Sequence, residues 1–285
     1  GRIDLGAYEG VYPTAGAIIP TTRGPTSAST LMFTVVFTKA VVNFNDSGDL
    51  LLIHSGSADA EDATIAPIDD FTYTVTLTGV DGDGTLRLAV NLDSDVEDLN
   101  GAPLIASVTS AAVTIDNTAA ITIDDLSMSF GGDGVINAAE LAAGQMISGT
   151  TDVEDGQAVE ISIGFLNATS GVISGTWSVT IDHDGSGGAL NISGLADGTI
   201  TVTAYVPDLA GNTAQASGDF ELDRMAPTIT IDDLSMAFGG DNVINATELE
   251  TGQTIQGAAT GVEDGEEVTV SVGGLRASST VLNGR

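Results

Sequence analysis

Residues Ile121 to Ile147 read ITIDDLSMSFGGDGVINAAELAAGQMI, and residues Ile229 to Ile255 read ITIDDLSMAFGGDNVINATELETGQTI. The two stretches are identical at 21 of 27 positions and lie 108 residues apart, an offset that becomes 109 at Val153-Glu-Asp-Gly and Val262-Glu-Asp-Gly. Solenoid repeats are about 20 to 50 residues long. The longer period found here therefore predicts a tandem array of small domains.

The repeat divides the chain into four expected parts. A complete domain is expected at 119–225, and a shortened copy at 226–285 that lacks the counterpart of Trp177 through Leu222. A divergent domain is expected at 14–118, because its closing residues Val113-Thr-Ile-Asp-Asn-Thr-Ala-Ala match Phe220-Glu-Leu-Asp-Arg-Met-Ala-Pro. Residues 1–13 are interpreted as the tail of an upstream domain.

Each unit shows short runs of alternating residues separated by Gly, Asp and Asn. In 158–163, Val159, Ile161 and Ile163 alternate with polar residues, and Trp177, Val179 and Ile181 follow the same period. A period of two with frequent turn residues is typical of half-buried strands in a β-sandwich. The sequence therefore predicts an all-β fold with Trp177 in the core. One short helix is expected after the cap-like Asn137.

Composition excludes several functions. The chain has 40 acidic and 7 basic residues, a formal charge of −33, and no cysteine. Nucleic-acid binding needs clustered Lys and Arg, whereas Lys39 is the only lysine. No run approaches the ~20 apolar residues of a membrane helix, and no export signal is recognisable at Gly1, so any signal is expected outside this chain. An apolar content of 42% nevertheless indicates a folded protein.

Catalytic motifs are also missing from the sequence. A Ser-His-Asp arrangement would have to use His54 or His183, and neither lies near a nucleophile motif, a metal-binding helix motif or a phosphate loop. Forty acids offer many carboxylate pairs, but aromatic residues for a sugar platform are few. We predict that the chain is not an enzyme.

Several motifs, in this order, resemble the tandem immunoglobulin-like repeats of very large bacterial surface adhesins and biofilm proteins. They are Ala226-Pro-Thr-Ile-Thr-Ile, Asp241-Asn-Val-Ile-Asn-Ala-Thr-Glu, the turn ending at Gln157, Gly175-Thr-Trp-Ser-Val-Thr, Leu195-Ala-Asp-Gly-Thr and Asp208-Leu-Ala-Gly-Asn. Phe33-Thr-Val-Val-Phe-Thr-Lys-Ala-Val resembles a sister type of domain, and Gly1 to Glu9 resembles the closing strand of a surface β-helix domain. The first junction departs from the pattern, because Ala119-Ala120 stands where Ala-Pro is usual.

The resemblance implies a beads-on-a-string stalk outside a bacterial cell, stiffened by calcium between domains. Its implied partners are the neighbouring domains of the same chain and a cell-surface or biofilm-matrix partner. Two alternatives remain open: a β-sandwich module that binds a glycan or a protein, and a spacer appended to a secreted enzyme.

The topology of an immunoglobulin-like sandwich predicts where the loop acids gather. The N-terminal pole of the second domain should collect Asp152, Glu154, Asp155 and Asp208 beside the linker residue Asp116. The C-terminal pole should collect Asp133, Asn137, Glu140 and Asp197 beside Asp223 of the linker and Glu263 and Asp264 of the next unit. Calcium takes six to eight oxygen ligands, and two carboxylates ~5 Å apart repel by roughly 3 kcal/mol at an effective dielectric of 20.

The candidate calcium ligands are therefore Asp116, Glu154, Asp155 and Asp208 at the first junction, and Asp133, Glu140, Asp197, Asp223, Glu263 and Asp264 at the second. The alternative is that these residues only shape turns, for which Asp is well suited. Asp81-Gly-Asp-Gly is expected to form a tight hairpin that could add a ligand at the first junction. The interpretation of Asp124-Asp125 stays open between a junction and a solvated strand end.

Overall fold

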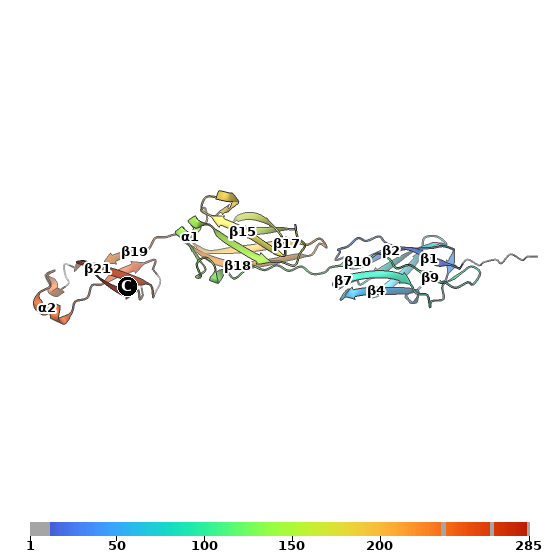
Figure 1. Cartoon of the computed structure of the whole chain (residues 1–285), viewed down its shortest axis with the longest axis horizontal. Helices are drawn as coiled ribbons and strands as arrows, with labels where there is room; N and C mark the ends of the chain where they lie inside the picture. Colours follow the sequence, from blue (N-terminus) through green and yellow to red (C-terminus); the bar gives the residue numbers. More distant parts are fainter. Residues whose placement is uncertain (1–11, 235–237, 263–264, 284–285) are drawn as a thin grey trace, which may run out of the picture.

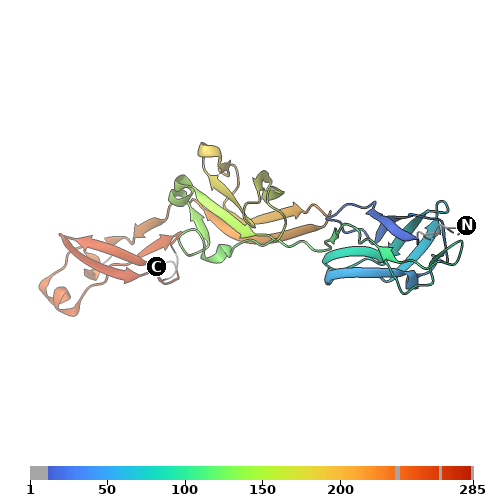
Figure 2. The ribbon, with the colours of Figure 1, turned by 45° about the vertical axis from the view of Figure 1, so that its right-hand side comes forward.

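The computed structural model describes residues 12–234, 238–262 and 265–283. The three units follow one another along the long axis of the molecule, from the first domain through the second to the unit that contains β19 and β21 (Figures 1 and 2). The predicted all-β fold of tandem immunoglobulin-like sandwiches is confirmed. The predicted upstream tail lies outside the described residues, except for Tyr12 and Pro13.

The first domain packs two main sheets around a core that runs from Ala15 to Ile115. The larger sheet has the order β5-β6-β2-β1-β9 and the smaller one β10-β7-β4, with β3 and β8 forming a separate pair. The strands are β1 (Thr14–Pro20), β2 (Thr30–Phe37), β3 (Val41–Val42), β4 (Leu50–Gly56), β5 (Asp62–Pro67), β6 (Thr72–Thr78), β7 (Gly84–Val90), β8 (Glu97–Asp98), β9 (Ala106–Ser107) and β10 (Val113–Ile115), with a 3-10 turn η1 (Ser47–Asp49).

Aromatic rings fill one part of this first core. Phe37, Phe44 and Tyr73 meet edge to face, with ring centroids 5.0 to 5.7 Å apart. The Tyr73 hydroxyl donates a hydrogen bond to the backbone oxygen of Val41 at 3.1 Å. Edge-to-face pairs add roughly 0.5–1.5 kcal/mol each beyond the area that they bury.

The second domain has its own core, which runs from Ile121 to Leu222. Its sheets have the orders β11-β18-β17-β13-β14 and β12-β15-β16. The elements are η2 (Leu126–Met128), β11 (Val135–Asn137), α1 (Ala138–Ala143), β12 (Gln145–Thr150), β13 (Ala158–Ile163), β14 (Leu166–Gly171), β15 (Thr176–Asp182), η3 (Ser186–Gly188), β16 (Leu190–Asn191), β17 (Gly198–Pro207) and β18 (Thr213–Asp223).

The alternation of apolar and polar residues in the sequence matches the alternation of buried and exposed side chains in the structure. Val159, Ile161 and Ile163 of β13 are buried, whereas Glu160 between them is exposed. Trp177 is 2% exposed, and its indole N–H donates to the backbone oxygen of Thr122 at 3.1 Å. Burial of such side chains supplies roughly 1.5–3 kcal/mol each. The core position predicted for Trp177 is confirmed.

The short helix predicted after Asn137 is also present. The Asn137 side chain accepts hydrogen bonds from the backbone of Ala139 and Glu140, and the Glu140 carboxylate accepts one from the backbone of Asn137 at 3.1 Å. This capping box satisfies amide groups that a helix start leaves without intrahelical partners.

The third unit consists of two separate strand pairs. Strand β19 (Thr228–Ile231) pairs with β20 (Gly257–Thr260), and β21 (Glu267–Val272) pairs with β22 (Leu275–Thr280). The chain between β19 and β20 contains η5 (Phe238–Gly240) and α2 (Ala246–Thr251), and α2 repeats the capping box of α1.

Candidate functional site

The first junction joins the two complete domains through direct hydrogen bonds. It is built from the linker 116–118, the 79–83 turn between β6 and β7, and two loops of the second domain, 151–157 and 208–212. The Ser27 hydroxyl of the first domain donates to the backbone oxygen of Ala210 in the second at 3.0 Å.

The linker is held on the first domain by its asparagine. The Asn117 backbone N–H donates to Asp83 Oδ1 at 2.8 Å, and the Asn117 side-chain amide donates to the backbone oxygen of Gly82 at 2.8 Å. Asp83 belongs to the Asp81-Gly-Asp-Gly turn, which therefore reaches the junction. The tight hairpin predicted for this turn is wrong, because β6 and β7 on either side of it belong to different sheets and do not pair with each other.

On the other side, Asn212 ties the linker to the second domain. Its side-chain amide donates to the backbone oxygen of Asp116 at 2.8 Å and to Asp208 Oδ2 at 2.7 Å, and its backbone N–H donates to Asp208 Oδ1 at 2.7 Å. Asp208 is buried. Glu154 reaches the same loop, where Glu154 Oε2 accepts from the backbone N–H of Leu209 at 3.3 Å. Sequence reasoning did not single out Asn212, although it lies four residues after a candidate ligand.

Charge accumulates at this junction. Partial burial raises the pKa of Asp116 above its ordinary value; a hydrogen bond from the Thr118 backbone opposes the rise, and the charges of Asp208, Asp83 and Glu154 add to it. The structure therefore brings Asp116, Glu154 and Asp208 together from three distant parts of the sequence and adds Asp83. Asp155 points elsewhere, accepting from the backbone N–H of Gly175 at 3.3 Å.

The donor chemistry of the first junction suits a hard cation, because carboxylate and amide oxygens are the ligands that calcium prefers. Over the ranges 12–234, 238–262 and 265–283, however, no three His, Cys, Asp or Glu side chains form a preformed metal-holding group. The four carboxylates thus interact through their charges without converging on one point.

The acids predicted for the second junction have local partners. Asp133 accepts from the backbone N–H of Val135 at 3.0 Å, Asp223 accepts from Met225 at 2.9 Å, and Glu140 belongs to the capping box of α1. Glu263 and Asp264 lie outside the described residues. Binding of calcium at this pole stays a prediction.

Asp197, the remaining acid of this group, is paired with an arginine of the second linker. Arg224 Nε lies 2.6 Å from Asp197 Oδ1, and the two other guanidinium nitrogens donate to the backbone oxygens of Ser193 at 2.9 Å and Leu195 at 2.7 Å. Arg224 occupies the linker position that Asn117 occupies at the first junction. This alignment is the signal by which the sequence could have revealed Arg224.

Two further acidic motifs form local turns. The buried Asp182 accepts hydrogen bonds from the backbone of Asp184 and Ser186 and from the Ser186 hydroxyl, so its carboxylate holds the turn together. Asp125 caps η2, where it accepts from the Ser127 backbone at 3.0 Å. Asp124 accepts a hydrogen bond from the Ser148 hydroxyl.

These sheets and junctions define a class of protein, the tandem immunoglobulin-like β-sandwich array. No family model and no curated protein matches the chain. Among solved structures, it is similar to a tetra-tandem repeat from the extending region of a large adhesion protein, with 22% identity, a TM-score of 0.33, and coverage of 95% of this chain and 63% of that one.

The chain is also similar to a solved chain from a structural study of a 1.5-MDa bacterial ice-binding adhesin, with 22% identity, a TM-score of 0.39, and coverage of 94% of this chain and 84% of that solved chain. A bacterial immunoglobulin-like domain of the M. primoryensis ice-binding adhesin is 28% identical over 36% of this chain and 96% of that domain, with a TM-score of 0.27. At these TM-scores, the fold assignment rests on the strand order of the chain itself.

Within the described ranges, none of the helices has the length and apolar character needed to cross a membrane. The two histidines, His54 and His183, are exposed and lie in different domains.

Proposed function

We propose that this chain is a stalk segment of a bacterial surface adhesin, which holds its domains in line outside the cell. The single observation that supports this function best is the first junction, where the linker is hydrogen-bonded to both of the domains that it joins. A flexible tether would leave its backbone groups to water, whereas these contacts restrict the angle between the domains. Similarity to extending-region repeats of adhesion proteins agrees with this role.

Calcium at the first junction is the second part of the proposal. The ion would be held by the carboxylates of Asp116, Asp208, Glu154 and Asp83. It would supply the positive charge that this cluster of four acids lacks. Its binding would draw the linker and the loops of both domains toward one centre. The raised pKa of Asp116 agrees with the proposal, because partial burial and, to a smaller extent, the charges of Asp208, Asp83 and Glu154 disfavour the charged form of this carboxyl, which a bound cation would stabilise.

The test measures the spread of interdomain distances with and without calcium. Because the chain has no cysteine, the exposed residues Met32 and Met146 can each be changed to Cys and spin-labelled uniquely, one in each complete domain. Calcium should narrow the distance distribution, and a chelator should broaden it again.

Asp116→Asn should remove this response, because the substitution deletes one charge but keeps the oxygen that accepts from Thr118. Asp223→Asn, at the matching position of the second linker, is the control and should leave the response unchanged. A narrow distribution that ignores calcium would defeat the calcium proposal and leave the stalk standing. A broad distribution under both conditions would defeat the stalk.

A further inference from the structure

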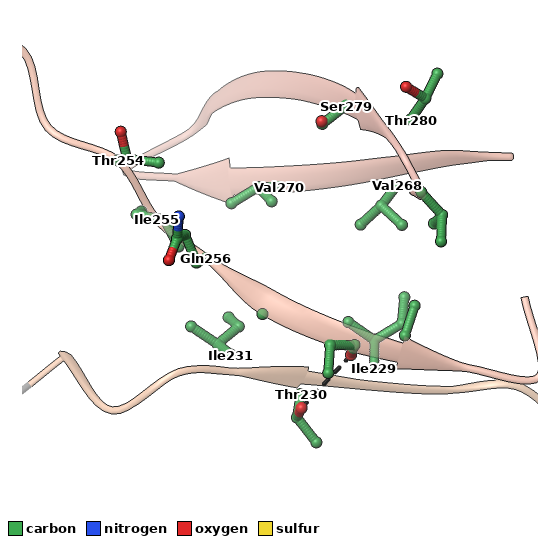
Figure 3. Close-up of a pocket in the computed structure, with 14 residues that line it drawn as sticks. Ile229, Thr230, Ile231, Thr254, Ile255, Gln256, Val268, Val270, Ser279 and Thr280 are labelled. Atoms are coloured by element: carbon green, nitrogen blue, oxygen red, sulfur yellow. Dashed lines mark hydrogen bonds between the residues drawn. The ribbon is translucent and has the colours of Figure 1, made fainter. Parts of the chain in front are cut away.

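Apolar side chains are exposed on strands in two different settings. In the third unit, Ile229, Val268 and Val270 line a cavity of about 320 Å³ between the two separate strand pairs (Figure 3). In the first domain, both sheets of a sandwich enclose a core. Leu51 and Ile53 of β4 are nevertheless 51% and 38% exposed there. Their exposure is therefore a property of a complete sandwich.

Strand β4 is paired on one side only. It pairs with β7 in a sheet of order β10-β7-β4. The second domain has the matching order β18-β17-β13-β14, in which β13 pairs with β17 on one side and with β14 on the other. In the first domain the next strand, β5, pairs with β6 in the opposite sheet, and in the described part of the chain no strand lies beside β4 where β14 lies beside β13. The second domain thus shows that an antiparallel strand fits this edge.

The hydrogen-bond pattern shows which backbone groups of β4 face the free edge. Just beyond the strand, the backbone N–H of Ser57 donates to the backbone oxygen of Asp83 at 2.8 Å. The register between β4 and β7 continues without a break from this pair. Because backbone groups alternate in direction along an antiparallel strand, odd-numbered residues of β4 bond to β7. The N–H and C=O groups of Leu52 and His54 therefore point to the free edge.

Strand β4 also lacks the features that usually protect an edge. Edge strands are commonly very short, bulged, or interrupted by a charged residue or a proline. Strand β4 is seven residues long, reads LLLIHSG, and contains no Asp, Glu, Lys, Arg or Pro. In a chain with 40 acidic residues, two copies can approach each other along this strand without placing carboxylates opposite each other.

We propose that two copies of this chain associate by pairing their β4 strands antiparallel. In the proposed register, Leu52 pairs with the same residue of the second copy through backbone hydrogen bonds. Leu51 of each copy then lies opposite Ile53 of the other, in the closer, non-hydrogen-bonded type of pair. These exposed side chains would cover one another, and two three-stranded sheets would join into one continuous sheet.

The sequence of β4 favours this register over its neighbours. The directions of the backbone groups allow only registers that differ by two residues. One such shift would place Ile53 opposite Asp49, whose carboxylate is buried and already accepts hydrogen bonds from the backbone of Asn45 and Asp46. The opposite shift would place Leu51 opposite Ser55. Only the register centred on Leu52 brings apolar side chains together on both sides of the axis.

The dimer should be weak and should orient its chains in opposite directions. One strand pair of this length covers less than the ~1,200 Å² of a stable interface, so we expect a Kd of roughly 10 μM to 1 mM. Strands β4 and β7 run along the long axis of the molecule (Figure 1), and stalks from two facing cells would meet in this antiparallel arrangement. This last consequence rests on the proposed stalk role, whereas the pairing itself does not.

The first test is sedimentation of the full chain from ~5 μM to ~1 mM, in ~0.15 M salt to screen its charge and with a chelator so that calcium does not bridge acidic surfaces. We expect a monomer–dimer equilibrium. Ile53→Lys should raise its Kd at least about tenfold, because it places a cation in the apolar centre of the pair. Ile19→Lys is the matched control and should leave the Kd unchanged, because Ile19 is also exposed but lies on β1 in the opposite sheet.

Hydrogen exchange of the unchanged chain gives a second readout that does not depend on the folding of a variant. The amides of Leu52 and His54 should exchange more slowly as the concentration rises. Those of Leu51 and Ile53 should change little, because they already bond to β7.

Disulfide trapping tests the register, since the chain has no cysteine. A mixture of Leu51→Cys and Ile53→Cys chains should cross-link under mild oxidation, because opposed residues of this type have Cα atoms about 4.5 Å apart, within the disulfide range of about 4.4–6.8 Å. Either variant alone should cross-link much less, because its cysteines would lie on a diagonal of about 7–8 Å.

Three results would overturn the proposal. The first is a chain that stays monomeric at ~1 mM, including one whose Leu52 and His54 amides are protected only by an added extended peptide of another sequence. The second is a dimer that Ile53→Lys leaves unchanged. The third is cross-linking that is as strong in the single variants as in their mixture. None of these results bears on the spread of interdomain distances within one chain, which tests the stalk role separately.

Discussion

The arginine of the second linker offers a quantitative test of how the second domain is closed. In Arg224→Ala, three contacts disappear together: the ion pair with Asp197 and the hydrogen bonds to the backbone oxygens of Ser193 and Leu195. The Arg224 and Asp197 side chains are 27% and 30% exposed, so solvent weakens the ion pair without removing it. Measured ion pairs of this kind contribute roughly 0.2–1 kcal/mol.

Each of the two hydrogen bonds to a backbone oxygen contributes about 1 kcal/mol. This value is low for a hydrogen bond from a charged donor, because water can replace the lost donor at this partly exposed site. Together the three contacts stabilise the second domain by roughly 2–3 kcal/mol. For a domain of about 107 residues, an unfolding entropy of about 2.1 cal/mol/K per residue converts this loss into a fall of about 9–13 °C in Tm.

The assay uses the fluorescence of Trp177. It is the only tryptophan of the chain and lies in the core of the second domain, so its emission reports the unfolding of that domain alone. Arg224→Lys is the matched control: it keeps the charge but lacks the planar fork, and it should recover less than half of the loss.

Asp197→Asn should cost less than Arg224→Ala, because it leaves both bonds to backbone oxygens in place. A loss below about 0.5 kcal/mol in Arg224→Ala would show that the guanidinium does not hold the 193–197 loop in solution. The same conclusion would follow if Arg224→Lys were as stable as the unchanged chain.

Three further predictions concern cores, pH and the first junction. Ile147→Ala should destabilise the second domain by about 2–5 kcal/mol, whereas Ile255→Ala, the same change in the third unit, should leave the Trp177 transition unchanged and alter exchange in 257–260 only slightly, because Ile255 is partly exposed. Hydrogen bonds from the backbone of Ala102 and Asn100 lower the pKa of Asp98, and Lys39 adds to the effect. The contribution of Asp98 to stability should be complete above pH 3.8 and should disappear as the pH falls through the lowered pKa of the folded state. An NMR titration that gave this carboxyl a pKa above 3.8 would contradict the prediction. Asn212→Ala removes the side-chain bond to the linker and should broaden the distances between spin labels at positions 32 and 146, so an unchanged distribution would argue against its bridging role.

Much of the fold could be predicted because its signals are local. The alternation of Val159, Ile161 and Ile163 specifies which face of a strand is apolar, and the Asn137 and Glu140 pair specifies a helix start within four residues. The repeat then extended both predictions to the third unit, where the same capping box appears at Asn245 and Glu248.

The candidate site was predictable only in part. Strand direction placed the loops of Glu154 and Asp208 at one pole, and the structure does bring them to Asp116. The same reasoning could not tell a free carboxylate from one with a partner: Glu140 caps a helix and Asp197 meets Arg224, 27 residues further along the chain. An Asp in a turn has the same local pattern in both cases, so only its spatial neighbours distinguish them.

By itself, the sequence determined the repeat, the strand faces and the acidic poles, because each depends on contacts within one period of the chain. The tertiary structure decided how the junctions are closed. Asn212 reaches Asp116 across 96 residues of sequence. At the second linker, the Arg224 side chain supplies a positive charge that pairs with Asp197, whereas at the first junction four carboxylates lie together. The tertiary structure also decided which apolar side chains are buried, because burial depends on the strands that pack against them.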